Sequence, residues 1–148
     1  MTSHATSPGA VLLADTLQQN GYSVTRTRQR VFGALEHQEP QTMNEIITSL
    51  AGVVDRASVY RTIALFEQLG IVQRLQIGWK YKIELSDRFS HHHHHLTCIV
   101  CGAIVALRED LLLEANLRGI ALDYQYKPVA HQLEIQGVCP KCQPKNQE

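Results

Sequence analysis

Hydrophobic residues recur three or four positions apart through most of the first half of the chain, which is the spacing of helices that bury one side. Glycine and proline residues interrupt the pattern and separate successive helices. The pattern predicts helices over residues 10–20, 27–37, 42–50 and 57–69. Two short runs rich in β-branched and aromatic residues follow at 71–75 and 80–85, around Gly78, and predict a hairpin.

Three helices followed by a two-stranded hairpin is the order of a winged helix-turn-helix domain, whose last helix enters the major groove of DNA. In residues 57–69, Val59, Ile63 and Phe66 form the predicted buried stripe, which places Arg61 and Thr62 on the opposite face. The alternative is an ordinary helical domain with solvated arginines, and the pattern leaves both open. The candidate DNA contacts are Arg26, Arg56, Ser58, Tyr60, Arg61 and Lys80.

The second half changes from helical spacing to short β-rich runs. Strands are predicted at 94–97 and 103–107, a short helix at 110–118, and one or two strands over 124–136, interrupted by Pro128. This indicates a small α/β unit after a helical one. The sequence therefore predicts an α+β chain of two domains, residues 1–88 and 89–148.

Composition narrows the class of protein without deciding it. The formal net charge is zero, so charge alone does not favour a nucleic-acid partner. No apolar run is long enough to span a bilayer, and the N-terminus lacks the charged-then-apolar order of a secretory signal. We expect a cytoplasmic protein.

Four cysteines form two C-x-x-C pairs, C-I-V-C-G and C-P-K-C. Each pair places two thiolates on one tight turn, and two such turns complete a tetrahedral S4 site that suits structural zinc. The alternatives are a redox dithiol or buried thiols, but a thioredoxin-like site needs only one pair on a βαβ scaffold. The predicted zinc ligands are Cys98, Cys101, Cys139 and Cys142.

Five consecutive histidines, His91 to His95, precede the first cysteine pair. In an extended strand, His91, His93 and His95 would point one way and His92 and His94 the other, so one strand could serve two metal sites. Imidazole suits Zn, Fe, Ni and Cu alike. The alternatives are an internal purification tag or a solvated low-complexity loop. Further ligands could come from Glu84, Asp87, Glu114 and His131.

Several motifs together resemble the ferric uptake regulator family. H-H-H-H-H-L-T-C-I-V-C-G resembles the family's histidine-rich strand and first cysteine pair, and R-A-S-V-Y-R-T-I resembles the start of its DNA-recognition helix. T-R-T-R-Q-R-V resembles its second helix, and L-G-I-V with Y-K-I-E-L resembles its wing. The resemblance runs from about Thr25 to Cys142, and its pattern is closest to zinc uptake regulators.

The resemblance implies a metal-dependent transcriptional repressor of metal-uptake genes, and not an enzyme. The N-terminal domain would be a winged helix, and the C-terminal domain would dimerise it and carry the four-cysteine zinc site. Metal at the domain junction would set the two DNA-binding domains at the spacing of successive major grooves. The implied partners are double-stranded operator DNA and a second copy of the chain, with no membrane and no small organic substrate. Tyr60 would be the main base-reading residue and Arg61 a phosphate or base contact.

The resemblance also implies two histidine-containing sites. His93 and His95 match the family's regulatory pair, Glu84 matches the acidic ligand at the end of the wing, and Asp87 is a second acidic candidate. An additional site would use His92, His94, Glu114 and His131.

Three positions depart from the family's patterns. Gln41 and Ala106 stand where iron-type members carry a histidine and an acidic ligand, with His37 four residues before Gln41, and Gln73 stands where zinc-type members carry an acidic one. A six-coordinate iron site is harder to build without these groups than a four-coordinate zinc site. Zinc is therefore the preferred regulatory metal over Fe²⁺, with Mn²⁺, nickel and peroxide sensing as remaining alternatives. Outside the family, the rivals are a zinc metallohydrolase and a metal-buffering module.

Overall fold

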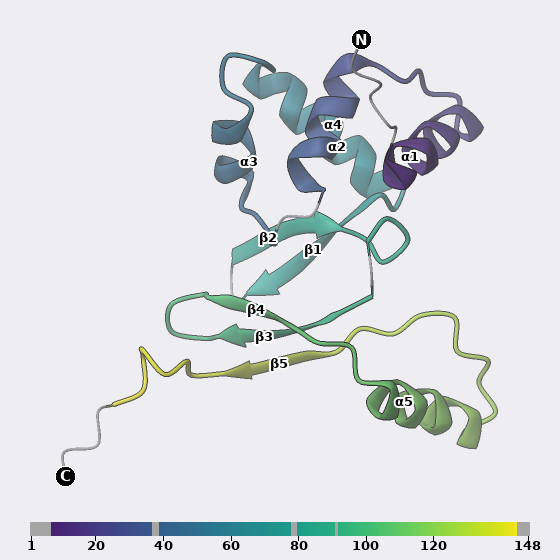
Figure 1. Ribbon diagram of the computed structural model, residues 1–148, viewed down its shortest axis with the longest axis vertical. Helices are drawn as coiled ribbons and strands as arrows, with labels where there is room; N and C mark the ends of the chain where they lie inside the picture. The colour runs from purple at the N-terminus through teal and green to yellow at the C-terminus, as the bar shows by residue number, and fades with distance from the viewer. Residues whose placement is uncertain (1–6, 37–38, 78–79, 91, 145–148) are drawn as a thin grey trace. The chain divides into compact units, whose positions relative to one another are not determined.

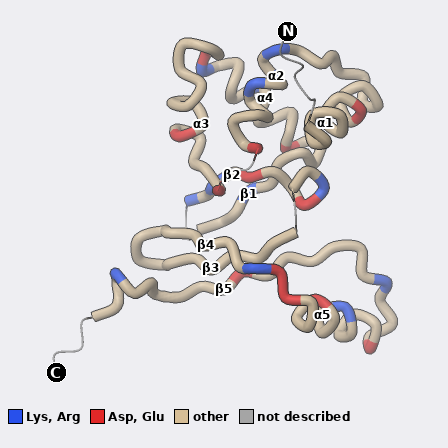
Figure 2. Tube along the Cα trace, in the orientation of Figure 1, with Lys and Arg blue, Asp and Glu red and all other residues tan. Residues whose placement is uncertain are grey.

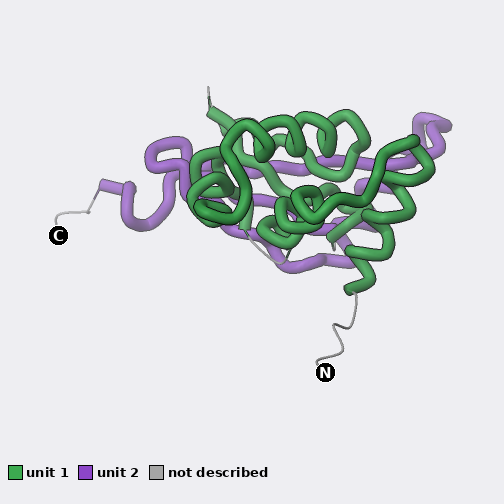
Figure 3. Tube along the Cα trace, turned by 90° about the horizontal axis from the view of Figure 1, so that it is seen from above, with its two compact units in different colours: residues 1–91 green, residues 92–148 purple. Residues whose placement is uncertain are grey.

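The computed structural model describes residues 7–36, 39–77, 80–90 and 92–144 (Figure 1). The chain divides into two compact units, Met1–His91 and His92–Glu148, coloured separately in Figure 3. The first unit contains α1 (Pro8–Gln19), α2 (Arg26–Leu35), α3 (Met43–Ser49), α4 (Arg56–Gln68), β1 (Val72–Ile77) and β2 (Lys80–Leu85). The second contains β3 (His94–Cys98), β4 (Ile104–Leu107), α5 (Leu111–Asp123) and β5 (Glu134–Gly137). The α+β class predicted from the sequence is confirmed.

Each helix of the first unit begins at a residue whose side chain accepts a hydrogen bond from a backbone N–H of the first turn. Such caps satisfy amide groups that have no partner within the helix. At α3 the cap is reciprocal, because Thr42 accepts from the Glu45 amide and Glu45 accepts from the Thr42 amide. The four capping residues are Ser7, Thr25, Thr42 and Asp55.

One apolar core holds the first unit together. It takes residues from all four helices, from both strands of the antiparallel β1–β2 hairpin and from the residue just before β1. The stripe predicted for the last helix is confirmed, with Val59 and Phe66 fully buried and Ile63 nearly so, while Thr62 is also buried rather than facing outward. The core consists of Leu13, Leu17, Val31, Phe32, Leu35, Ile46, Leu50, Val59, Ile63, Phe66, Ile71, Val72, Ile83 and Leu85.

The second unit is built on a three-stranded sheet in the order β4-β3-β5, with α5 between β4 and β5 in sequence. The central strand β3 runs antiparallel to β4 and parallel to β5. The residues buried in this unit lie on β3, whereas α5 buries none of its side chains. Among the helices that the structure describes, none has the length and apolar character needed to cross a membrane.

Two predicted elements of the second half differ from the structure. The helix continues beyond residue 118 to Asp123, and Gln125 then turns the chain with a φ of 61°. Of the one or two strands predicted over 124–136, with Pro128 as the interruption, the structure forms only the last part, β5. The hairpin turn at Gly78, together with His37 and His91, lies outside the described residues.

Candidate metal centres and DNA-binding surface

The structure brings the four cysteines together at one end of the sheet. Their Sγ atoms all lie within 4.8 Å of one another, and the Sγ atoms of Cys101 and Cys139 are 3.8 Å apart. The first pair occupies the turn after β3, which Gly102 closes with a φ of 71°, and the second occupies the turn after β5. Because Cys98 pairs with Gly137 in the parallel ladder, the two turns emerge side by side.

The hydrogen bonds around these sulfurs shift the pKa values of two of the thiols in opposite directions. The Cys139 amide donates to the Cys98 Sγ at 3.3 Å, and with the Cys101 amide it lowers the pKa of the Cys98 thiol to about 6. Hydrogen bonds with Cys139 and Cys101 raise the pKa of the Cys142 thiol to about 12. The four cysteines form no disulfide, and a cation bound among their converging sulfurs would stabilise the thiolate form of each. The donor set and its spacing fit a tetrahedral zinc ion.

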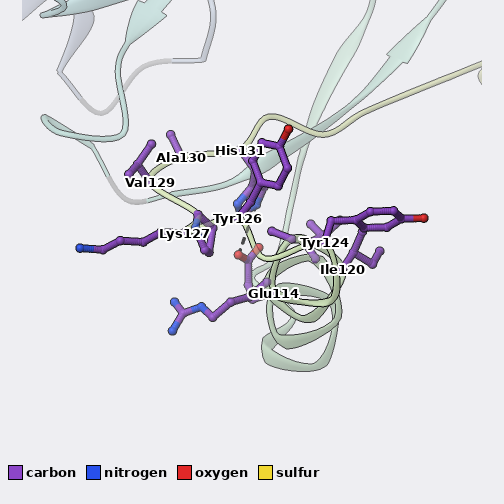
Figure 4. A pocket seen from close by; sticks show the side chains of 12 residues that line it. Glu114, Ile120, Tyr124, Tyr126, Lys127, Val129, Ala130 and His131 are labelled. Atoms are coloured by element: carbon purple, nitrogen blue, oxygen red, sulfur yellow. Dashed lines mark ion pairs between the residues drawn. The ribbon is translucent and has the colours of Figure 1, made fainter.

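A second cluster joins β3 to α5 and to the segment before β5. The His94 Nε2 lies 2.8 Å from the Glu114 Oε1, the His131 Nε2 lies 3.3 Å from the Glu114 Oε2, and the Nε2 atoms of His92 and His131 are 3.0 Å apart. Figure 4 shows Glu114 on α5 facing His131, beside a cavity of about 540 Å³. All four side chains offer ligand atoms within 4.8 Å of one another.

The charges within this cluster hold Glu114 ionised. Burial of the carboxylate would by itself raise its pKa, but the hydrogen bond with His94 and the charges of His131 and His92 outweigh burial and lower the pKa. Three imidazoles and one carboxylate around a common point form a donor set that suits zinc and other divalent transition metals.

His93, which directly precedes β3, and His95 within the strand form a second pair of imidazoles. Their ring centroids are 4.6 Å apart, so the two imidazoles form an adjacent pair. The alternation expected of an extended strand is thus present, with His92 and His94 at Glu114 and His93 and His95 on the other side. Ala106 on β4 and Glu134 on β5 are both paired with His95.

In the first unit, Glu84 lies on β2 and is buried. The Gln73 Nε2 donates a hydrogen bond to the Glu84 Oε1 at 2.7 Å from the directly paired position on β1. Asp87 lies in the exposed turn after β2. Gln41 forms a bridge with Ile83, and its Nε2 donates to the Ala34 carbonyl at 2.8 Å, so its side chain serves the backbone.

The outward face of α4 carries a cluster of polar and cationic side chains. Tyr60 is 45% exposed, and the Arg56 guanidinium lies 5.7 Å from its ring centroid. The Arg61 Nη2 donates to the Ser58 Oγ at 3.0 Å. This face is presented to solvent because Val59 and Ile63 hold the opposite side of the helix in the core.

Cationic side chains of α2 and of the β1–β2 hairpin, the predicted wing, are further candidate DNA contacts. Arg26 opens α2, a helix with three arginines and no acidic residue, and Lys80 opens β2 at an exposed position (Figure 2). A polar hollow of about 250 Å³ lies between the start of α2 and α4, and Arg28 and Arg61 are among its lining residues. Arg30 is used structurally, since its Nη1 donates to the Val53 carbonyl at 3.2 Å before α4. The hollow beside Arg28 and Arg61 suits a DNA backbone phosphate better than a base edge, because its lining is polar and cationic.

Comparison with known proteins agrees with this arrangement. A sequence profile of the ferric uptake regulator family matches residues 19–136. The chain belongs to the ferric uptake regulator family. The ferric uptake regulation protein of Legionella pneumophila is 30% identical over 133 residues, which cover 86% of this chain and 96% of that protein.

Solved structures support the same assignment. The Vibrio cholerae ferric uptake regulator superposes with a TM-score of 0.68 at 28% identity, covering 86% of this chain and 99% of that one. The Helicobacter pylori ferric uptake regulator has a similar fold, with a TM-score of 0.75 at 22% identity and coverage of 94% of each chain.

Membership of the ferric uptake regulator family makes the chain a metal-responsive transcriptional regulator rather than an enzyme. This excludes the metallohydrolase and metal-buffering alternatives. The sequence did not single out Glu134 as the neighbour of His95, or Gln73 as the partner of Glu84, because both relationships depend on strand register.

Proposed function

We propose that this member of the ferric uptake regulator family is a zinc-responsive repressor of metal-uptake genes. It would be a cytoplasmic protein that binds operator DNA as a homodimer. The observation that carries the proposal is the central strand β3, which directs imidazoles to both of its faces and ends in the four-cysteine cluster. We assign Cys98, Cys101, Cys139 and Cys142 to structural zinc.

The regulatory metal would be held by His93 and His95, with Glu84 or Asp87 as the acidic ligand from the first unit. Two positions that could enlarge the ligand set carry none, because Gln41 donates to a backbone carbonyl and Ala106 has only a methyl group. Fewer ligands favour a four-coordinate zinc ion over six-coordinate iron. Fe²⁺ or Mn²⁺ sensing is the alternative within the family.

The second unit supports association with a second copy of the chain. In its sheet, Leu96 is paired with Val105 and with Ile135, and all three side chains are exposed. On α5, Leu111 and Leu112 are more than two-thirds exposed, at 77% and 71%. Apolar surface of this extent on a small domain is typical of a protein–protein interface. We propose that the second copy covers it, with the additional site at His92, His94, Glu114 and His131 holding α5 to β3.

The metal would act by linkage. If the metal binds the DNA-competent arrangement more tightly than other arrangements, its binding raises the population of that arrangement by the ratio of the two affinities. In the DNA complex, we assign base reading to Tyr60 and backbone or base contacts to Arg61. The supporting cations and polar groups would be Arg26, Arg56, Ser58 and Lys80.

The test is the affinity for the DNA upstream of the protein's own gene, titrated against buffered free Zn²⁺ and, without oxygen, against Fe²⁺. We expect tight binding at sub-nanomolar zinc, and its loss in His93→Ala with the four-cysteine zinc retained. Binding driven by micromolar Fe²⁺ and not by zinc would contradict the zinc assignment. DNA binding that is independent of any metal would contradict the regulatory role of His93 and His95.

A further inference from the structure

Glu134 occupies the position next to His95 in the parallel ladder between β5 and β3. Residues that face one another on neighbouring strands project to the same side of the sheet, whereas successive residues alternate. Glu134 is therefore on the side that carries His93 and His95, and its neighbour Ile135 is on the side of Leu96. No motif in the sequence places a carboxylate there.

The environment of this carboxylate indicates a missing positive partner. Its Oε1 is buried, and within residues 7–36, 39–77, 80–90 and 92–144 no group forms a hydrogen bond with that atom. A buried carboxylate oxygen is costly unless a donor or a cation compensates for the water it has lost. The imidazoles of His93 and His95 lie on the same side, and a metal ion bound by them, as proposed above, would supply this partner.

His95 has a neighbour on each flank, and only one of them can donate to a metal. On the β4 side the paired residue is Ala106, and on the β5 side it is Glu134. The strand β4 therefore offers no carboxylate beside His95, whereas β5 offers Glu134 at the position paired with it. Adjacent strands are about 4.8 Å apart, and a glutamate side chain spans that distance by rotation about its own bonds.

We propose that Glu134 is a ligand of the metal bound by His93 and His95. This inference rests on the proposed function of that pair. With His93, His95, Glu134 and one acidic residue from the first unit, the site has four ligands, the number that zinc takes in a tetrahedral site. Glu134 is then the group that makes the four-coordinate set complete without Gln41 or Ala106.

The test compares Glu134→Gln with Glu109→Gln, which removes one exposed carboxylate from the same unit. Both are placed in full-length protein that keeps the four-cysteine zinc and carries His92→Ala and His131→Ala, so that the additional site is silent. Zn²⁺ affinity is measured by competition with a chelating dye, and Co²⁺ absorption reports the ligand set. We expect Glu134→Gln to weaken Zn²⁺ binding by at least about tenfold and to change the Co²⁺ bands. Glu109→Gln should leave both unchanged.

A rescue variant separates a ligand from a merely structural residue. Ala106→Glu, added to Glu134→Gln, returns a carboxylate to the other flank of His95, and we expect it to recover most of the lost affinity. Unchanged affinity in Glu134→Gln, or a loss that Ala106→Glu does not reverse, would overturn the proposal. If the parent binds no metal that His93→Ala removes, the proposed function itself fails, which is a different result.

A measurement on the unchanged protein covers the case in which Glu134→Gln does not fold. In a crystal structure of the zinc-loaded protein, a Glu134 oxygen should lie about 2.0–2.2 Å from the ion held by His93 and His95. An ion bound there without an oxygen of Glu134 would contradict the assignment.

Discussion

Gln73 and Glu84 face each other across the β1–β2 hairpin, and the Gln73 side-chain amide donates to the Glu84 carboxylate at 2.7 Å. The amide occupies one carboxylate oxygen and restricts rotation of the Glu84 side chain. Groups that orient a metal ligand in this way commonly change metal affinity by about ten- to a hundredfold when they are removed.

We therefore expect Gln73→Leu to lower the metal affinity of the proposed regulatory site by about tenfold and to leave zinc binding by the four cysteines unchanged. The measurement is competition with a chelating dye, and Gln76→Leu on the same strand is the matched control. Equal affinities for Gln73→Leu and the parent would mean that Glu84 does not need this hydrogen bond or is not a ligand.

Removal of one sulfur should disrupt the second unit. Cys139→Ser removes one of the four sulfurs that we assign to zinc, whereas the backbone amide of this position, which donates to the Cys98 Sγ, is retained. Because α5 buries no side chain of its own, the unit has little apolar core with which to compensate. We expect the zinc content to fall by one ion per chain and the dimer to dissociate or unfold, as measured by metal analysis and sedimentation. A stable dimer with full zinc content would show that the cluster is not a structural site.

The DNA-binding surface should separate into residues that read sequence and residues that bind phosphate. Tyr60 is exposed at the second turn of α4, whereas Arg26 lies at the start of α2. We expect Tyr60→Ala to lose about 1–3 kcal/mol of binding free energy, mainly on operator DNA. Arg26→Ala should weaken binding to operator DNA and to random DNA equally. It should also lower the slope of log affinity against log salt concentration by about one. Titrations at several salt concentrations give both quantities, and equal losses on both DNAs for Tyr60→Ala would refute a base contact.

The capping box of α3 should give the first unit a specific pH dependence. Hydrogen bonds from the Thr42 amide and hydroxyl hold the pKa of Glu45 below its ordinary value of 4.5. Because the folded pKa is the lower one, the stabilisation is present above pH 4.5 and is lost as the pH falls through the folded value. We expect Thr42→Ala to lower the free energy of unfolding by about 1 kcal/mol at pH 7.

Urea unfolding of the parent and of Thr42→Ala at pH 7 and pH 3 tests this effect. The difference in unfolding free energy between the two proteins should be smaller at pH 3 than at pH 7, because Glu45 is increasingly protonated as the pH falls towards its folded pKa. Thr48→Ala, at an exposed position of the same helix, is the control and should change stability by less than about 0.5 kcal/mol. A difference that is the same at both pH values would mean that the Glu45 charge does not contribute.

The local pattern of hydrophobic residues was sufficient to predict most of the helices and strands of the first unit. Val59, Ile63 and Phe66 were predicted as the buried stripe of α4 because a 3.6-residue period records which side of a helix is buried. Thr62 was assigned to the face opposite this stripe, but it lies three residues after Val59 and four before Phe66, a spacing that places it on the buried side of the helix. In the second unit, Gly119 lies in the interior of α5 and does not end the helix. A glycine inside a helix costs only about 1 kcal/mol relative to alanine, so its presence alone does not mark the end of a helix.

Some features of the candidate sites could be predicted from single segments, and others depend on how distant strands pair. The cysteine turns and the alternation of His92 to His95 follow from spacing within short segments. The pairing of Glu134 with His95 joins strands that are separated by a helix and a long connection, and a shift of one residue would put Ile135 in its place. Only the three-dimensional register distinguishes those two outcomes.

The unbroken histidine run gives β3 an unusual tolerance to changes in its own length. In most strands, the gain or loss of one residue exchanges the two faces and moves every ligand to the wrong side. Here both neighbours of His92, His93 and His94 are histidines, so a shift of one residue would leave imidazole at these positions on both faces. The cysteine pair does not share this tolerance, because Cys98 must remain opposite Gly137. Cys98 therefore fixes the register of the strand. We expect related chains to vary in the number of histidines more readily than in the number of residues between Cys98 and the nearest histidine.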